Sequence, residues 1–454
     1  MLLLSLLIPV EDIPEDVKIY PSIIACRIKE KGLGLWKFET RHCLHGGSME
    51  QGKDFDFSCS PTGSHPAVRA QLSKSAIRSH RIYGVDVSNC FQNDVIKPED
   101  RLYVHAPPCY KEWQQLVFPE IKVKPSKSGK HALQTINGVQ GRKDAGRSWY
   151  LLLVRIFEAF GLLPCPAEPA LFSYFDGPDE LTIITSTDDF LISSSSISLF
   201  KRLCTHIEEY VPITIQEGPV IKYLNIRIIQ TELGISIDQT HHIQTSVLDT
   251  WFPATKTERL KSADTPYRTD SQYERDLQEQ LPATGTQLAK LEKEHGGKFN
   301  ALIGQFLHIE QVTRFEIGFA VTRLAQFNAA PNAASFAGLK RIARFLATHP
   351  HAPIFYPVLK LTMHQTIRFE IEPGKYIEQL ISNLREMYVD ADHARDLKTR
   401  KSITRVLSAV CGVLIHWHMG KQTCVTAHST DAEIRVYYTA EQINKYLRMV
   451  DEYM

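Results

Sequence analysis

The sequence lacks any bias toward one sign of charge. Its 454 residues include 52 Lys and Arg against 51 Asp and Glu, which gives a formal net charge of +1 at pH 7. No global field therefore favours a polyanionic partner, and a nucleic-acid groove would need locally clustered basic residues. The 43% hydrophobic and 23% charged contents are ordinary for a globular protein, and the length predicts roughly two to four domains.

Cysteine pairs and long apolar runs are also missing. The nine cysteines are scattered singly without a C-x-x-C pair, which excludes a disulfide framework or zinc finger and favours a reduced, intracellular protein. No stretch approaches about 18 uninterrupted apolar residues, so we expect no membrane-spanning helix. The start, MLLLSLLIPV, lacks a basic n-region and a cleavage site. We favour a buried strand, or a start without function, over a signal peptide there.

A hairpin with adjacent acids is predicted at LTIITSTDDFLIS, residues 181–193. Two apolar runs rich in β-branched residues flank a polar stretch, which is typical of a tight hairpin. Asp188 and Asp189 would lie at its tip, where neighbouring carboxylates repel each other unless a cation or proton lies between them. Because Mg²⁺ usually takes one or two carboxylates plus substrate phosphates, these acids are candidate ligands. A solvated Asp-Asp turn is the alternative for this stretch alone.

Two stretches before this hairpin carry further candidate residues. RIYGVDVSNCFQND alternates like a strand, and Asp86 points opposite to its apolar neighbours. QGRKDAGR, residues 140–147, is a glycine-bearing basic turn that leads into an apolar helix expected over 148–160. Glycine permits close backbone approach, and the basic side chains suit phosphate or a stacked base. A solvent-facing strand acid and a solvated helix start are the alternatives for these stretches in isolation.

The remaining pattern predicts a mixed α and β chain. We expect two strands over 19–43 joined by a turn at Gly32 and Gly34, and a helix after Pro66. The polar residues 252–298 indicate a long linker. Apolar residues at helical spacing then predict helices over 299–312, 317–327 and 334–349. The last segment predicts strands over 366–373, 384–392, 408–419 and 422–429, and a closing helix over 431–453.

From about residue 19 onward, the motifs and their order resemble the reverse transcriptase of copia-type LTR retrotransposons. GRKDAGRSWY matches the family's GLKQAxRxWY element, and TSTDDFLI stands where the family has YVDDxLI. YVDADHARDLKTRKSITRV and HWHMGKQTCVTAHSTDAEIRV resemble the start of its RNase H domain. The resemblance implies an α+β fold, a right-hand polymerase with fingers, palm and thumb followed by a connection and an incomplete RNase H-like α/β domain. The corresponding ranges are 1–18 (unassigned), 19–250 (fingers and palm), 251–364 (linker, helical thumb and connection) and 365–454 (partial RNase H-like domain).

The resemblance also implies a two-metal nucleotidyl-transfer site. The metal ligands would be Asp86, Asp188 and Asp189, which would bind catalytic Mg²⁺, with Mn²⁺ as a substitute. With this site the chain would extend a primer on an RNA or DNA template with dNTPs. In the RNase H-like segment, Asp390 and Glu433 would be two of the metal-binding carboxylates. Because the chain ends soon after Glu433, we expect this module to lack later acids and to be inactive by itself.

Five residues carried over from the family would contact substrate. Arg41 would reach the incoming triphosphate from the fingers. Phe91, five residues after Asp86, would be the steric gate against a ribose 2′-hydroxyl. Gln140, Gly141 and Lys143 would line the nucleotide and template side of the pocket. An aromatic residue at such a position is otherwise ordinary core.

Departures from the family pattern leave a second hypothesis, a catalytically silent remnant that at most binds nucleic acid. Ser186-Thr187 replaces the family's Tyr-Val, and Glu39 replaces a fingers lysine, which places a negative charge near the triphosphate. A metal hydrolase that uses His416 and His418 is weaker, because no third ligand has suitable spacing.

The resemblance also implies where the chain acts and with what. It implies that the chain acts in cytoplasmic virus-like particles, with the nucleus as the alternative location. It implies no membrane partner. Self-association or association with other Pol polyprotein segments is compatible with it.

Overall fold

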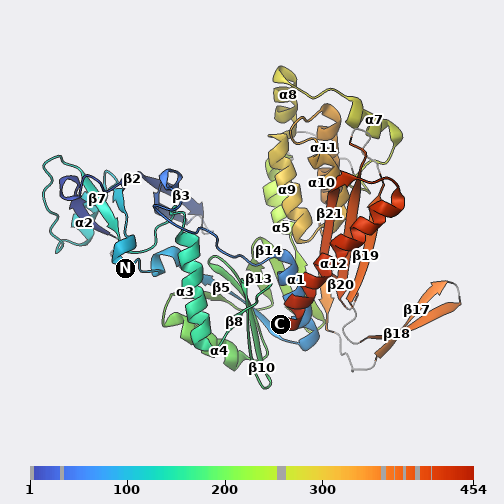
Figure 1. Cartoon of the computed structure of the whole chain (residues 1–454), viewed down its shortest axis with the longest axis horizontal. Helices are drawn as coiled ribbons and strands as arrows, with labels where there is room; N and C mark the ends of the chain where they lie inside the picture. The colour runs from blue at the N-terminus through green and yellow to red at the C-terminus, as the bar shows by residue number, and fades with distance from the viewer. Residues whose placement is uncertain are drawn as a thin grey trace.

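The computed structural model of this chain shows a mixed α/β protein built around a six-stranded antiparallel sheet (Figure 1). A small N-terminal sheet lies at one end of the view, and a helical bundle and a C-terminal sheet lie at the other. Within the described residues, no helix is both long and apolar enough to cross a membrane. The structure describes residues 5–30, 35–252, 262–358, 365–372, 374–381, 385–393, 399–410 and 412–454.

The first strand of the chain is part of a four-stranded N-terminal sheet, which confirms the predicted buried strand. The order of this sheet is β1 (Ser5–Pro9), β7 (His131–Thr135), β6 (Tyr103–His105) and β2 (Ile19–Tyr20). Helix α2 (Tyr110–Val117) lies between β6 and β7 in the chain. The predicted strands that follow Ile19 form a long antiparallel pair, β3 (Ser22–Glu30) and β4 (Trp36–Leu44). The expected turn at Gly32 and Gly34 lies outside the described residues.

The central sheet has both faces covered by helices. Alternate residues of its strands point to opposite faces, and one face packs against α3 (Ala145–Phe160) and α4 (Ile197–Glu208). The other face packs against α1 (His65–Arg78), the helix predicted after Pro66. The strands are, in spatial order, β12 (Ile213–Gln216), β5 (Arg81–Val87), β11 (Asp189–Ser194), β10 (Asp179–Ser186), β9 (Leu171–Asp176) and β8 (Leu163–Pro164).

A second four-stranded sheet packs over the α1 side of the central sheet. Its strands are β13 (Val220–Tyr223), β14 (Ile226–Thr231), β15 (Gly234–Asp238) and β16 (Ile354–Pro357). Ile221 sits so close to Gly84 on β5 that a Cβ placed there would lie 2.9 Å from the Ile221 Cγ2 atom. Glycine at this position therefore allows the two sheets to come into contact.

The helical bundle corrects the expectation of a linker over 252–298. Two helices lie inside that range, and Tyr273 and Leu277 are buried in the core of the bundle. Asp270 accepts a hydrogen bond from the Tyr273 N–H, 2.9 Å, and so caps the first of them. The helices are α5 (Thr240–His242), α6 (Asp249–Trp251), α7 (Ser271–Glu279), α8 (Gly285–His295), α9 (Phe299–Val312), α10 (Gly318–Ala325) and α11 (Ala333–Thr348). The last three confirm the helices predicted there, and the Asn332 side chain caps α11 by accepting a hydrogen bond from the Ser335 N–H at 2.8 Å.

The C-terminal region contains two small sheets and one long helix. A two-stranded pair, β17 (Gln365–Glu372) and β18 (Lys375–Ile381), stands apart from the rest in Figure 1. The predicted single strand over 408–419 is wrong, because Gly412 has φ +74° and the chain turns back there. The resulting sheet is β19 (Arg385–Asp392), β20 (Lys401–Val410) and β21 (Val413–Val425), and α12 (Ser429–Tyr453) packs on it.

One buried arginine connects three of these units. Arg69 on α1 is 3% exposed, and its guanidinium lies 3.8 Å from the centre of the Trp417 ring on β21. Its Nε donates to the carbonyl oxygen of Ile415 at 2.7 Å, and its Nη1 donates to that of Gln311 on α9 at 2.8 Å. Trp417 Nε1 donates in turn to the Glu310 carbonyl oxygen at 3.0 Å. The central sheet, the bundle and the C-terminal sheet therefore share one core.

Candidate active site

The predicted acid hairpin is formed by β10 and β11. Ser186 lies opposite Asp189, so Thr187 and Asp188 make a two-residue turn. Thr187 has φ +56°, which is unfavourable for a β-branched residue. Trp149 on α3 donates its Nε1–H to the Thr187 carbonyl oxygen at 2.6 Å and fixes the turn. No local sequence pattern predicts this contact, although Trp149 belongs to the GRKDAGRSWY motif.

The structure brings the three predicted polymerase aspartates together. Asp86 on β5 lies directly opposite Asp189 on β11, which puts both side chains on the same face of the sheet. The N–H of Val87 donates to the Asp188 carbonyl oxygen at 2.9 Å and ties the turn to β5. Asp86 and Asp189 are half-buried, whereas Asp188 is exposed at the turn.

Burial and mutual repulsion shape the chemistry of this acid group. Burial raises the pKa of Asp189 to about 6, and the negative charges of Asp188 and then Asp86 add to the shift. Carboxylates in such a group favour a bound cation, and hard oxygen donors suit Mg²⁺. In the described ranges, no three His, Cys, Asp or Glu side chains are gathered closely enough to hold a metal ion. Since Mg²⁺ usually completes its shell with water and substrate phosphates, this open set of donors fits it.

Phe91 lies in a short 3-10 turn after β5, Cys90–Asn93. Its ring is partly buried against the core between the central sheet and α3 and α4. Gly138 approaches the Phe91 main chain so closely that a Cβ at Gly138 would lie 2.2 Å from the Phe91 carbonyl oxygen. The position of Phe91 is therefore set by a backbone contact as well as by the packing of its ring.

The glycine-bearing turn docks against the end of β4. Leu44 N–H donates to the Gln140 carbonyl oxygen at 2.8 Å. Gly141 has φ +92°, and a Cβ there would lie 2.0 Å from the Leu44 carbonyl oxygen, so this contact requires glycine. The Lys143 N–H points to Met49 Sδ at 3.5 Å. Gln140, Gly141 and Lys143 thus adjoin β4, where Arg41 is exposed and lies opposite Ala25.

One basic residue of this turn is occupied by structural contacts. Arg142 donates to both carboxylate oxygens of Asp144, from Nε at 2.9 Å and from Nη2 at 2.7 Å. Its Nη1 also donates to the Asp100 carbonyl oxygen at 3.1 Å. Arg142 therefore holds the turn in shape, and Lys143 and Arg147 are the basic side chains left beside it.

Asp390 and Glu433 are near each other in space but lie on different faces of the C-terminal sheet. Asp390 is exposed on β19 and pairs with Arg405 Nη1 at 2.7 Å. Its neighbours Val389 and Ala391 pack toward α12, so the Asp390 side chain emerges on the opposite face. Glu433 on α12 accepts a hydrogen bond from the Ala391 N–H at 3.2 Å. The structure does not bring the two carboxylates to one metal position.

The histidines do not form a metal site in the parts of the chain that the structure describes. His416 lies on β21 as predicted, and burial lowers its pKa to about 4, so it stays neutral at pH 7. His65, His242 and His308 cluster between α1 and the bundle, with ring centres 6.2 and 5.3 Å apart. Burial lowers the pKa of each of them. These are half-buried side chains whose neutral form is favoured, which fits packing rather than hydrolysis.

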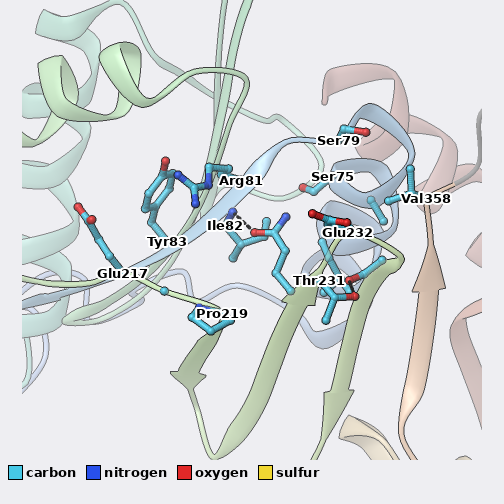
Figure 2. A pocket seen from close by; sticks show the side chains of 15 residues that line it. Ser75, Ser79, Arg81, Ile82, Tyr83, Glu217, Pro219, Thr231, Glu232 and Val358 are labelled. Atoms are coloured by element: carbon cyan, nitrogen blue, oxygen red, sulfur yellow. Dashed lines mark hydrogen bonds between the residues drawn. The ribbon is translucent and has the colours of Figure 1, made fainter.

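A separate cavity of about 480 Å³ opens at the far end of β5, away from the acids (Figure 2). Arg81, Tyr83, Glu217 and Glu232 are among its lining residues. The dashed line in Figure 2 is the hydrogen bond from the Ile82 N–H to Gln230 Oε1 at 3.0 Å. This bond connects β14 to the start of β5 and so fixes where the second sheet crosses the central one.

Three aspartates at the ends of adjacent antiparallel strands form a carboxylate group that can hold a divalent cation, as nucleotidyl-transfer chemistry requires. The chain belongs to the reverse transcriptase (RNA-dependent DNA polymerase) family, whose model matches residues 8–258. Its curated relatives are retrotransposon Pol polyproteins, which confirms the resemblance to the copia-type proteins.

The similarity to these relatives is modest and covers only part of them. The Pol polyprotein from transposon RE1 of Arabidopsis thaliana is 23% identical over 399 residues, 88% of this chain and 24% of the relative. The one from transposon TNT 1-94 of Nicotiana tabacum is 22% identical over 425 residues, 92% and 28% respectively. The chain thus spans about a quarter of their length. A solved telomerase from Candida albicans, in complex with a fragment of telomeric RNA, aligns with a TM-score of 0.29 and 11% identity over 74% of this chain and 65% of that one, too low to assign a fold.

Proposed function

We propose that this chain is an RNA-directed DNA polymerase that extends a primer 3′-hydroxyl with dNTPs at Asp86, Asp188 and Asp189. The observation that carries the proposal is the placement of Asp86 directly opposite Asp189, with Asp188 at the adjoining turn. When bound there, Mg²⁺ or Mn²⁺ would activate the primer hydroxyl and neutralise the triphosphate. Asp86 and Asp189 would hold the ion from the two strands, and exposed Asp188 would approach it from the turn.

Five residues frame the incoming nucleotide in this proposal. Arg41, exposed on β4, would contact the triphosphate. Phe91, whose position is fixed by Gly138, would exclude a ribose 2′-hydroxyl. Gln140, Gly141 and Lys143 would line the template side, and their docking against β4 supports a shared pocket with Arg41.

The arrangement of units supports a right-hand polymerase. In this proposal, residues 19–250 form fingers and palm, with the central sheet as the palm and the β3–β4 pair as part of the fingers. Residues 251–364 form the thumb and connection, of which α7 to α11 are the helical part. Residues 365–454 are the partial RNase H-like domain, and residues 1–18 add a strand to the N-terminal sheet.

The RNase H-like segment is proposed to be inactive by itself. Asp390 is held by Arg405, and Glu433 is bonded to the main chain of β19 on the other face of the sheet. A pair of carboxylates separated by a sheet does not share a metal ion. Hybrid cleavage by the purified chain that is lost in Asp390→Ala would refute this part of the proposal.

Primer extension tests the polymerase function. The purified chain is assayed on poly(rA)/oligo(dT) with dTTP and Mg²⁺ or Mn²⁺, beside Asp188→Ala and a matched control, Asp179→Ala. Asp179 starts the same strand, β10, at the end away from the acid turn. We expect extension by the parent and the control, and none by Asp188→Ala.

A catalytically silent remnant that binds nucleic acid is the alternative, and the acid turn favours it in one respect. The two residues before the acids, Ser186 and Thr187, provide no aromatic ring to seat the primer end. A folded chain that binds primer–template but shows no extension with either metal would establish this alternative and overturn the polymerase proposal.

The proposed partners and location follow from the family. The partners are an RNA or DNA primer–template and dNTPs, with self-association or other Pol polyprotein segments as further partners. The proposed location is the virus-like particle in the cytoplasm, with the nucleus as the alternative. Co-sedimentation of the expressed chain with particle-associated nucleic acid would test this placement.

A further inference from the structure

The β13–β14 hairpin crosses the central sheet in a fixed register. The Ile82 N–H is bonded to Gln230, which pairs through its own N–H with the Pro219 carbonyl oxygen at the start of the hairpin. Ile221, two residues after Pro219, packs over Gly84, two residues after Ile82. Since alternate residues of a strand share a face, Tyr223 faces the central sheet with Ile221. It lies in the same core as Leu191, which is two residues after Asp189 on β11.

Tyr223 is almost fully enclosed there. Its side chain is 2% exposed, and its hydroxyl has no hydrogen-bond partner among the described residues. Burial raises the pKa of Tyr223, and the nearby charges that add to the rise are those of Asp189 and Glu168. The Tyr223 hydroxyl is thus a buried donor with two carboxylates in its surroundings.

Only one of these carboxylates already accepts hydrogen bonds. Glu168 Oε2 accepts from the Ser64 hydroxyl at 2.6 Å and from the Tyr446 hydroxyl of α12. In the part of the chain that the structure describes, no hydrogen bond reaches the Asp189 side chain. A buried donor without a partner is unfavourable, and Asp189 is the acceptor with open positions.

We propose that Tyr223 is a positioning residue of the polymerase site, whose unpartnered hydroxyl is available to donate a hydrogen bond to the Asp189 carboxylate and to hold it toward Asp86. The inference rests on the proposed function, because it assigns Tyr223 to the same acid group. An outer residue that orients a metal-binding carboxylate raises the affinity of the site for its ion. Tyr223 lies 34 positions after Asp189, so no local sequence pattern connects the two.

Tyr356 provides a matched control. It is 1% exposed on β16, belongs to the same core as Tyr223, and its hydroxyl also has no partner among the described residues. The charge near Tyr356 is that of Arg69 and not a carboxylate of the acid group. Removal of either hydroxyl with phenylalanine keeps the packing of the ring, so a merely structural role predicts equal effects.

A double-mutant cycle on the full chain tests the contact without any need for catalysis. The unfolding equilibrium is measured in denaturant, without divalent metal, for Tyr223→Phe, Asp189→Asn and the double variant. We expect a coupling of at least about threefold in the unfolding constant, and additive effects for Tyr356→Phe with Asp189→Asn. Additivity for Tyr223 as well, or coupling to Glu168→Gln instead, would overturn the proposal.

Mn²⁺ binding followed by EPR gives the second readout. Tyr223→Phe is expected to weaken the Mn²⁺ affinity about tenfold, while Tyr356→Phe leaves it unchanged. Equal affinities in Tyr223→Phe and the parent would refute the positioning role. A chain that shows the coupling and the Mn²⁺ effect but never extends a primer would keep this contact and overturn the polymerase function alone.

Discussion

Asp86 and Asp189 are directly opposite residues in an antiparallel strand pair, and both emerge on the face of the sheet that α1 and the β13–β14 hairpin cover. Opposite residues in such a pair have Cβ atoms roughly 5 Å apart, and like charges at this distance destabilise the sheet. A cation between the two carboxylates would relieve this repulsion.

Asp189→Asn is expected to stabilise the metal-free protein. At pH 8 the change removes one charge from a group of three carboxylates, two of which are half-buried. The gain in unfolding free energy should be on the order of 1 kcal/mol after allowance for solvent screening. Chemical denaturation in EDTA measures it. Asp179→Asn is the control, because Asp179 lies opposite Asp176 in a more exposed acid pair and should gain less. A loss of stability in Asp189→Asn would contradict the repulsion.

Thr187→Gly is expected to stabilise the acid hairpin. Thr187 has φ +56°, and two-residue hairpin turns favour Gly, Asn or Asp where φ is positive. Relief of the left-handed strain, less the added flexibility of the unfolded chain, should yield about 0.5–1 kcal/mol. Denaturant midpoints of Thr187→Gly and Thr187→Ala separate the two effects. A stabilisation by alanine as large as that by glycine would disprove the role of φ.

Arg69→Met is expected to destabilise the whole chain by about 3 kcal/mol or more. The methionine fills the space of the arginine stem but leaves the carbonyl oxygens of Ile415 and Gln311 without their donor in a buried site. Arg275→Met is the control, since Arg275 is exposed and, among the described residues, donates to the Ser271 carbonyl oxygen of its own helix. Equal unfolding free energies for the two variants would show that the buried guanidinium contributes nothing net.

Glu310→Gln is expected to remove a pH dependence of stability. Burial raises the pKa of Glu310 to about 7, and the charge of Arg69 only partly opposes this. Because the pKa of Glu310 is higher in the folded than in the unfolded state, its protonation favours the folded state. This contribution to the unfolding free energy is fully present below about pH 4.5 and is lost as the pH rises through 7. Glu310→Gln should therefore raise the unfolding free energy by about 2–3 kcal/mol at pH 8 and change it little at pH 4. The unfolding free energy of Glu310→Gln is measured at both pH values, with Glu279→Gln as the exposed control. An equal change in unfolding free energy at pH 4 and pH 8 would contradict the prediction.

The elements that depend on local pattern could be predicted from the sequence. The acid hairpin, the Asp86 strand, α9, α11 and α12 each carry their own periodicity, and Asn332 carries its own cap signal. The α7 and α8 helices could not, because their polar sequences become helical through a few side chains, such as Tyr273 and Leu277, that bury against α11. The turn at Gly412 was hidden inside a continuous apolar run.

The supporting contacts of the candidate site depend on distant parts of the chain. The resemblance pointed to Asp86, Asp188 and Asp189, and the strand pairing puts them together. Nothing in the sequence indicated that Trp149 bonds the Thr187 carbonyl or that Arg405 pairs with Asp390. These partners become neighbours only after the sheets have formed, so a local pattern does not encode them.

The shared core around Arg69 determines where this chain can be divided. Ile415, Trp417, Leu447 and Val450 of the C-terminal unit are buried in the same cluster as Leu72 of α1. A fragment that stops before β21 would expose this apolar surface to water. It would also leave the Arg69 guanidinium without the Ile415 carbonyl oxygen to which it donates. Recombinant fragments of this chain therefore need α12 to cover the shared core, and the central sheet and the C-terminal sheet should unfold in a single transition.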